Sequence, residues 1–232
     1  MLKKLLKLLD SDPLVALFET KLNVTVLDLM KKRQLNRTGR HATENLIEPS
    51  KFCLRKIYYQ KKNNVSEIHS YETLKRFLQG IVIHNKYQRL FKLAKMLRYK
   101  AETTFYSRFL GVTATPDSII NFLNLVYVIE VKSMDPNLFY HVKQPPKLVR
   151  LQANIYMYIV GIPRAIILIE NKGTQDLKIF FIEIDFDIIS RFLRRHFLIL
   201  RMLDSGKKPK QKCKKITDKL TKTCKFKEEC FR

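Results

Sequence analysis

The spacing of apolar residues predicts two helices with strands between them. From Tyr71 to Tyr99, and again from Lys147 to Gly161, apolar residues recur every three or four positions, which is the period of an amphipathic helix. The stretches at 109–115, 118–120 and 125–129 are rich in β-branched and other apolar side chains. Because a turn bounded by two asparagines separates the first two stretches from the third, we predict adjacent antiparallel strands.

Further periodic segments extend this core toward the C-terminus. Strands are predicted near Arg164–Ile169 and Lys178–Ile184, followed by a final helix from Asp187 to Leu203. A chain of 232 residues is long enough for one substantial core and too short for two catalytic domains. We therefore predict a helical N-terminal portion at 1–66, a core at 67–203 and a lysine- and cysteine-rich end at 204–232.

Two carboxylates and a lysine come together if the two strands pair. Asp117 follows Pro116 on the first stretch, and Glu130-Val131-Lys132 lies on the second. Glu130 and Lys132 are separated by one residue, so their side chains project from the same face of the strand. Both carboxylates and the backbone carbonyl of Val131 would bind a hard divalent cation, beside which a lysine stabilises charge on a scissile phosphate. The alternative is a surface hairpin with an ordinary Glu–Lys ion pair.

The two predicted helices carry three further candidate residues. His84 lies on the apolar face of the first helix, where an imidazole either bonds to a carbonyl in the core or binds a metal. Gln152 and Tyr156 are four residues apart and therefore lie on one flank of the second helix. They are either a buried amide and a packing aromatic ring, or groups that hold DNA or a metal-bound water.

The order of these motifs resembles the PD-(D/E)XK nuclease superfamily in its RecB-like branch. The matching segments are Gly80-x3-His84, Gly111-x5-Asp117, Glu130-Val131-Lys132-Ser133 and Gln152-x3-Tyr156. The resemblance implies an α/β fold with a restriction-endonuclease-like core, in which helices flank a mixed sheet. The implied metal ligands are His84, Asp117 and Glu130. Lys132 is the implied catalytic lysine, and Gln152 and Tyr156 form the branch's Q-x3-Y motif at the active site.

By this resemblance the chain is a DNA nuclease that hydrolyses phosphodiester bonds with Mg²⁺ or Mn²⁺. A histidine ligand makes Mn²⁺ a good candidate. The implied substrates are single strands or DNA ends, including those of 5′-to-3′ exonucleases, and the implied partners are proteins of CRISPR adaptation or of viral or cellular recombination and repair. Lys172 lies in Glu170-Asn171-Lys172, which resembles an E-N-K segment of some RecB-like nucleases. It is either a phosphate contact or a solvated lysine.

Four cysteines flank the predicted core. Cys53 precedes it, and Cys213, Cys224 and Cys230 crowd the C-terminal end among many lysines. The sequence shows no secretory signal, so we expect a reducing, intracellular setting in which thiols bind a metal or cluster rather than form disulfides. The lysines are expected to favour the thiolate forms.

The cysteines resemble those of the four-cysteine iron–sulfur subset of RecB-like nucleases, which includes the fourth CRISPR-associated nuclease family and AddB-type nuclease domains. The resemblance implies that all four hold a [4Fe–4S] cluster that ties the two ends of the core together. Cys224-x5-Cys230 matches the subset's final spacing, whereas ten residues separate Cys213 from Cys224 where the family commonly has C-x2-C. Zn²⁺ on the same four sulfurs, or thiols without a ligand, are the alternatives.

The net charge favours nucleic acid as the partner. Lysine and arginine number 45 against 21 aspartates and glutamates, which gives a formal net charge of +24. Such an excess favours DNA over acidic protein and predicts binding that weakens steeply with salt. A membrane surface is the other partner of basic chains, but no apolar run is long enough to span a bilayer and no lipidation motif is present. We therefore expect a cytoplasmic protein without a membrane partner, and a homo-oligomer is compatible with the sequence.

A function of another class fits the same charge. A non-catalytic module that keeps the nuclease fold and covers DNA with its basic surface would also need an excess of lysine and arginine. The presence of all the catalytic residue types at the family's spacing favours the nuclease. Dependence of DNA cleavage on a divalent cation distinguishes the two functions.

Overall fold

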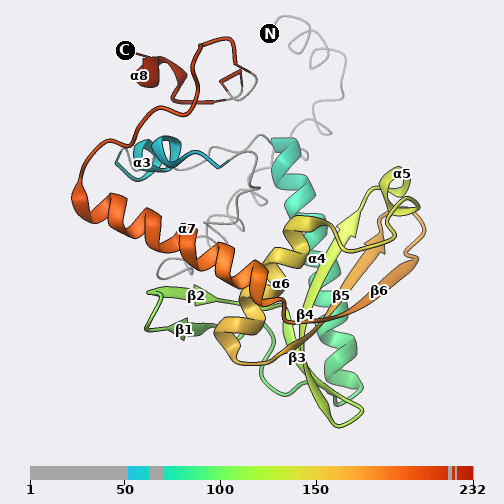
Figure 1. Cartoon of the computed structure of the whole chain (residues 1–232). Helices are drawn as coiled ribbons and strands as arrows, with labels where there is room; N and C mark the ends of the chain where they lie inside the picture. The colour runs from blue at the N-terminus through green and yellow to red at the C-terminus, as the bar shows by residue number, and fades with distance from the viewer. Residues whose placement is uncertain (1–51, 63–70, 219–220, 223, 232) are drawn as a thin grey trace, which may run out of the picture.

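The computed structural model describes residues 52–62, 71–218, 221–222 and 224–231 (Figure 1). Most of the helical portion predicted at 1–66 therefore lies outside the described residues. The described part of the chain holds a four-stranded sheet, a two-stranded sheet and helices on both faces of the larger sheet. The predicted α/β class is confirmed.

The larger sheet is mixed. Its strands, in spatial order, are β3 (Ser118–Phe122), β4 (Leu125–Met134), β5 (Arg164–Asn171) and β6 (Leu177–Glu183). β4 and β5 run parallel, whereas the two outer pairs are antiparallel. A parallel pair needs a long crossover connection, which here consists of the short helix α5 (Pro136–Phe139) and the helix α6 (Lys147–Val160). The end of β4 is thereby held next to the start of α6.

Helices cover both faces of this sheet, with α4 (Tyr71–Leu93) behind it and α6 in front of it in Figure 1. Tyr87 of α4 is buried against Ile129 and Val131 of β4. On the opposite face, Met157 of α6 is buried against Val128. α7 (Phe186–Ser205) packs against α6 on the side away from the sheet. The candidate residues on β4 are therefore enclosed between two helical layers.

Local signals set the ends of α6 and α7 close to where the sequence predicts them. α6 ends at Gly161, which adopts the left-handed conformation with φ of 75° and donates its N–H to the carbonyl of Met157. The side chain of Asp185 accepts hydrogen bonds from the N–H groups of Asp187 and Ile188 and so caps the start of α7.

The predicted pairing of residues 109–115 with the strand at 125–129 is wrong. On this side β4 pairs with β3, which begins at Ser118, whereas β2 (Val112–Ala114) pairs with β1 (Phe105–Ser107) in a separate small sheet. Pro116 has no N–H to donate to a strand ladder. At this break the side chain of Asp117 accepts the N–H of Val131. The interruption thus turns Asp117 toward the centre of β4.

The long helix is shorter than predicted. It ends at Leu93 rather than at Tyr99, because Lys95 adopts a left-handed conformation with φ of 53°. The chain then runs beside β3, where Leu97 forms an isolated bridge with Ile120. Among the described helices, none is both long and apolar enough to cross a membrane.

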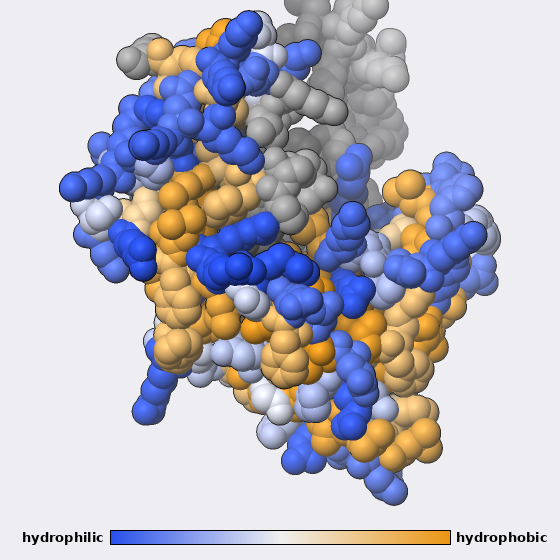
Figure 2. Space-filling model, viewed as in Figure 1, coloured by the Kyte–Doolittle hydropathy of each residue, from blue (hydrophilic) through white to orange (hydrophobic). Residues whose placement is uncertain are grey.

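The two ends of the described chain pack against each other. The ring of Tyr59 in α3 (Leu54–Lys62) stacks on Phe226, with centroids 5.7 Å apart, and its hydroxyl donates to the carbonyl of Glu229 at 2.9 Å. Glu229 lies in α8 (Lys227–Phe231). Figure 2 shows hydrophilic residues gathered over this C-terminal segment, at the upper left of the view, where the sequence is rich in lysine.

Candidate active site

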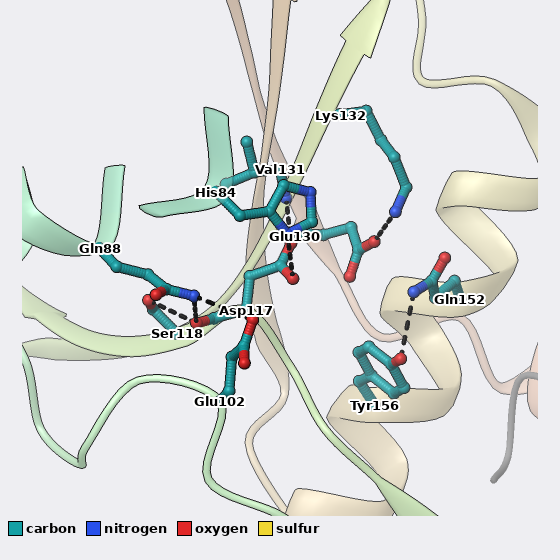
Figure 3. A network of polar contacts seen from close by, with 10 residues as sticks. All are labelled: His84, Gln88, Glu102, Asp117, Ser118, Glu130, Val131, Lys132, Gln152 and Tyr156. Atoms are coloured by element: carbon teal, nitrogen blue, oxygen red, sulfur yellow. Dashed lines mark hydrogen bonds and ion pairs between the residues drawn. The ribbon is translucent and has the colours of Figure 1, made fainter. Parts of the chain in front are cut away.

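Asp117 joins α4 to β4. Its Oδ2 accepts the N–H of Val131 at 2.7 Å, and its Oδ1 lies 2.9 Å from Nδ1 of His84 (Figure 3). The contact of Val131 with Asp117 is therefore made by the N–H group of Val131. His84 approaches from the middle of α4, so this helix and the break before β3 bring together two residues that are far apart in the sequence.

Glu130 and Lys132 lie on the same face of β4, as predicted. Glu130 is fully buried, and its Oε1 forms an ion pair with Nζ of Lys132. Within the described part of the chain, no donor forms a hydrogen bond with Oε2 of Glu130. A buried carboxylate oxygen without a donor is costly unless a cation or water satisfies it. This oxygen is therefore the atom of the site that most needs a cation, a proton or a water as a partner.

The site shifts the pKa values of its acid and base groups. Burial, together with the charge of Asp117, raises the pKa of Glu130 to about 7, although Lys132 opposes this shift. Burial lowers the pKa of His84, but the hydrogen bond and charge of Asp117 outweigh it, so the net pKa is raised. Lys132 behaves in the same way, since the charges of Glu130 and Asp117 overcome its burial and raise its pKa. Lys132 is therefore protonated at neutral pH.

Gln152 and Tyr156 face this site from α6. Nε2 of Gln152 donates to the hydroxyl of Tyr156 at 3.1 Å, so the pair predicted on one flank of the helix is formed. Tyr156 is buried on the same face of the sheet as Val128, which is two residues before Glu130 on β4. Figure 3 shows the pair on the helix beside Lys132 and Glu130.

Two residues of the network are not singled out by the sequence motifs. Nε2 of Gln88 donates to the backbone carbonyl of Asp117 at 3.2 Å and lies 3.5 Å from Oε1 of Glu102 (Figure 3). Gln88 follows His84 by one helical turn, a spacing that puts both side chains on one face of α4. That spacing is a signal in the sequence, whereas the position of Glu102 depends on the left-handed turn at this residue, with φ of 55°.

The donor set fits a divalent cation although the side chains are paired with one another. No group of three or more histidine, cysteine or acidic side chains is arranged around a common metal position among the described residues. Instead, His84 pairs with Asp117, and Glu130 pairs with Lys132. Carboxylate oxygens and one imidazole are nonetheless ligands that Mg²⁺ and Mn²⁺ accept. The unsatisfied oxygen of Glu130 supports this fit.

Lys172 lies at a different place. It lines a pocket of about 410 Å³ between α4 and the end of β5, together with Lys86 and Glu170. The carboxylate of Glu170 is buried and accepts hydrogen bonds from Lys86 and from the hydroxyl of Tyr87, both at 2.6 Å. Lys172 thus lies beside the hydrogen bonds that hold α4 to the end of β5. A contact between Lys172 and a phosphate stays a prediction.

The four cysteines carry free thiols, and three of them affect the pKa of the fourth, Cys213. Burial raises the pKa of Cys213, and the nearby Cys53, Asp218, Cys230 and Cys224 raise it further. The prediction that the surrounding lysines favour the thiolate is therefore wrong for Cys213, because burial and these negative groups raise its pKa instead. Cys53, Cys224 and Cys230 thus lie near enough to Cys213 to act on its pKa, but the four sulfurs are not grouped around a common metal position in the described residues.

The metal-free protein is expected to lose stability as the pH rises from about 4.5 to about 7. The folded pKa of Glu130 is about 7 against 4.5 for an unperturbed glutamate, so in this window the folded state keeps a proton that the unfolded state releases. The stability that this bound proton contributes is fully present below pH 4.5 and is lost as the pH rises through the folded pKa of Glu130. The raised pKa of His84 acts in the same direction above 6.5.

Urea unfolding in the presence of a chelator measures this dependence. The free energy of unfolding should fall between pH 4.5 and pH 7 in the wild type. Glu130→Gln carries no titrating proton and should show a much flatter profile over the same window. Equal slopes for the two proteins would contradict the assignment of this pKa to Glu130.

The comparisons with known proteins support the fold. No family model and no curated protein matches the chain. A crystal structure of SSO0001 matches with a TM-score of 0.55 at 14% identity, over 78% of this chain and 88% of that one. LHK-Exo in complex with dAMP matches with a TM-score of 0.52 at 14% identity, over 72% and 89%.

A second structure of LHK-Exo, an alkaline exonuclease from Laribacter hongkongensis, matches with a TM-score of 0.50 at 13% identity, over 71% of this chain and 86% of that one. Identities this low establish a similar fold and no more. The predicted restriction-endonuclease-like architecture, in which helices flank a mixed sheet, is confirmed by this likeness.

Proposed function

We propose that the chain is a metal-dependent nuclease that hydrolyses phosphodiester bonds in DNA. The observation that carries the proposal is the buried carboxylate of Glu130, which has one oxygen without a donor and lies beside Lys132 and Asp117. A purely structural ion pair would not need a second carboxylate and an imidazole beside it, whereas here Asp117 and His84 lie close enough to act on Glu130. The net charge of +24 supports a polyanionic substrate.

His84, Asp117 and Glu130, with the backbone carbonyl of Val131, would hold Mg²⁺ or Mn²⁺. When bound, such a cation supplies an activated water at neutral pH and stabilises negative charge on the reacting phosphate. The raised pKa of Glu130 means that its carboxyl group must first give up a proton. Each oxygen of Asp117 has a further lone pair beside its present partner, His84 or the N–H of Val131, that it would offer to the cation.

The chain's own residues position the phosphate. Lys132 is protonated and half-buried, so its ammonium group can donate to a phosphate oxygen where charge develops. On the facing helix, the Nε2 group of Gln152 donates to the hydroxyl of Tyr156. This hydrogen bond orients the side-chain amide of Gln152 and does not involve its Oε1. We assign that oxygen to a water or a sugar of the bound strand.

The proposed substrates are single strands or DNA ends, as in recombination, repair or CRISPR adaptation. The name of one solved structure of similar fold describes an alkaline exonuclease, and another solved structure of that protein contains dAMP. Both descriptions support a nucleotide as the ligand of this fold. Proteins of those pathways are the proposed partners, alongside DNA.

We also propose that Cys53, Cys213, Cys224 and Cys230 bind a [4Fe–4S] cluster. The electrostatic influence of Cys53, Cys224 and Cys230 on Cys213 supports the proposal, and a cluster would draw together four sulfurs that are not grouped around a metal position in the described residues. Thiolates are soft ligands suited to iron–sulfur clusters and to Zn²⁺. Zn²⁺ on the same sulfurs is the alternative, and the colour of the protein distinguishes the two.

Digestion of end-labelled DNA with a metal titration tests the proposed nuclease. The wild type should release label from single-stranded DNA in Mn²⁺ or Mg²⁺, should stop when a chelator is added, and should recover when the metal is restored. Single- and double-stranded substrates labelled at either end also report the polarity of cleavage. Binding of both substrates without cleavage at any metal concentration would instead support a non-catalytic DNA-binding module.

A further inference from the structure

A second cluster of charge lies on the other side of α4 from the pocket of Lys172. Four cations line a pocket of about 600 Å³, which we call the basic pocket: Arg89, Lys92, Arg98 and Lys100. Arg89 and Lys92 come from α4, whereas Arg98 and Lys100 come from the chain after it. The remaining lining is Asn85, Gln88, Leu97, Tyr99 and Ala101, so no carboxylate lines the pocket.

The wall opposite α4 is held in place by β3. The N–H of Arg98 donates to the carbonyl of Ile119 at 2.9 Å, and the N–H of Asn121 donates to the carbonyl of Met96 at 2.8 Å. Further along, the N–H of Glu102 donates to the carbonyl of Asp117 at 3.3 Å. The backbone of the segment 96–102 is thus tied to the sheet along its length.

The basic pocket is continuous with the candidate active site. Gln88 lines the pocket and donates to the backbone carbonyl of Asp117 (Figure 3). Asn85 lines it as well and directly follows His84 in α4. Glu102, whose carboxylate lies 3.5 Å from the amide of Gln88, is a negative group at the end of the pocket near Asp117. A strand whose phosphate lies at Asp117 therefore has its neighbouring nucleotide within reach of the pocket.

The chemistry of the lining matches one nucleotide. A volume of about 600 Å³ is in the range of small-molecule sites. The four cations suit a phosphate, and the ring of Tyr99 is 43% exposed and lies in a T-shaped contact with Phe105. Arg98 lies 5.8 Å from the centre of that ring. An exposed aromatic ring beside cations is how proteins bind unpaired bases.

We propose that the basic pocket binds an unpaired nucleotide of the DNA strand adjacent to the scissile phosphate. The proposal rests on the proposed nuclease function. A base stacked on Tyr99 is separated from any complementary strand, so the pocket selects substrates that are single-stranded on this side of the cleavage position. The cations hold the phosphate of that nucleotide and thereby set the register of the strand over Asp117.

Binding measured in a chelator tests the pocket without requiring cleavage. Fluorescence anisotropy with a labelled single strand of about 12 nucleotides and with a blunt duplex gives the affinity and its salt dependence. The double variant Arg89→Gln/Arg98→Gln should bind the single strand about tenfold or more weakly, and its salt slope should fall by about 1.4, for two lost phosphate contacts. The control Arg194→Gln/Arg201→Gln removes the same charge from exposed positions on α7 and should leave the slope nearly unchanged.

Tyr99→Ala separates stacking from charge. It should weaken single-strand binding about 5- to 100-fold and leave duplex binding unchanged. Equal losses for the arginine double variant and its control would overturn the proposal, as would a Tyr99→Ala protein that binds both substrates like the wild type. Thermal melting confirms that each variant is folded. If the wild type binds DNA but never cleaves it, the nuclease function fails while these binding results still decide whether the pocket holds an unpaired nucleotide.

Discussion

Lys132→Met is expected to reduce DNA cleavage by about a thousandfold while DNA affinity changes by less than about threefold. The ammonium group of Lys132 is the one cation paired with the buried carboxylate of Glu130 in the described structure, and its raised pKa keeps it charged. A charge that acts on the reacting phosphate contributes mainly to the transition state, so its loss lowers kcat rather than binding. The remaining lysines and arginines maintain affinity for the DNA backbone.

Single-turnover digestion of an end-labelled strand measures this loss, and anisotropy measures the affinity. Lys143→Met is the matched control, because Lys143 is exposed in the connection before α6. It should cleave like the wild type. A Lys132→Met protein that cleaves at a rate near that of the control would remove Lys132 from the mechanism.

Cys230→Ser is expected to release the metal or cluster and to lower the melting temperature by about 10 °C or more. In the proposed assignment, a metal or cluster on the four cysteines would join Cys53, directly before α3, to the segment after α7, and a cross-link that closes so long a loop stabilises a fold by about 4–5 kcal/mol. Side-chain contacts at this junction include the ring stacking of Tyr59 on Phe226 and the hydrogen bonds of Tyr59 to Glu229 and of Lys212 to the carbonyl of Phe52. A bound metal or cluster would add a cross-link to these contacts, and the loss of that cross-link is the reason for the expected fall in melting temperature.

Anaerobically purified protein provides the measurement. The wild type should be brown, with broad absorption at about 400 nm, if a cluster is bound, and colourless with stoichiometric zinc if Zn²⁺ is bound. Thr217→Ser, an exposed substitution in the same segment, is the control. A wild type that binds neither metal, together with a Cys230→Ser protein of unchanged melting temperature, would contradict the cysteine assignment.

The sequence predicts the elements of this fold well where the signals are local. The periods of 3.6 and 2 residues locate α4, α6, α7 and the strands β3 to β6, because each of these elements buries one or both faces. Gly161 and Asp185 mark helix ends through their own backbone and side-chain chemistry. The strand break at Pro116 is also encoded locally, but which strand takes β2 as its partner depends on tertiary packing.

The candidate site divides in the same way. The motif order is enough to predict that Asp117, Glu130 and Lys132 meet, since strand pairing alone brings them together. The parts that local patterns do not predict are the carbonyl contact of Gln88, the turn at Glu102 and the basic pocket. These depend on how the chain after α4 folds back along β3, which hydrogen bonds between distant segments determine.

The most direct test is a Mn²⁺ titration of single-strand cleavage with wild-type and Asp117→Ala proteins side by side. Asp117 is the residue that links His84 of α4 to the backbone of β4. The wild type should show cleavage that rises and saturates with Mn²⁺, whereas Asp117→Ala should bind the strand and leave it intact at every metal concentration. Cleavage by a purified Asp117→Ala protein at the wild-type rate would contradict the assignment of this site.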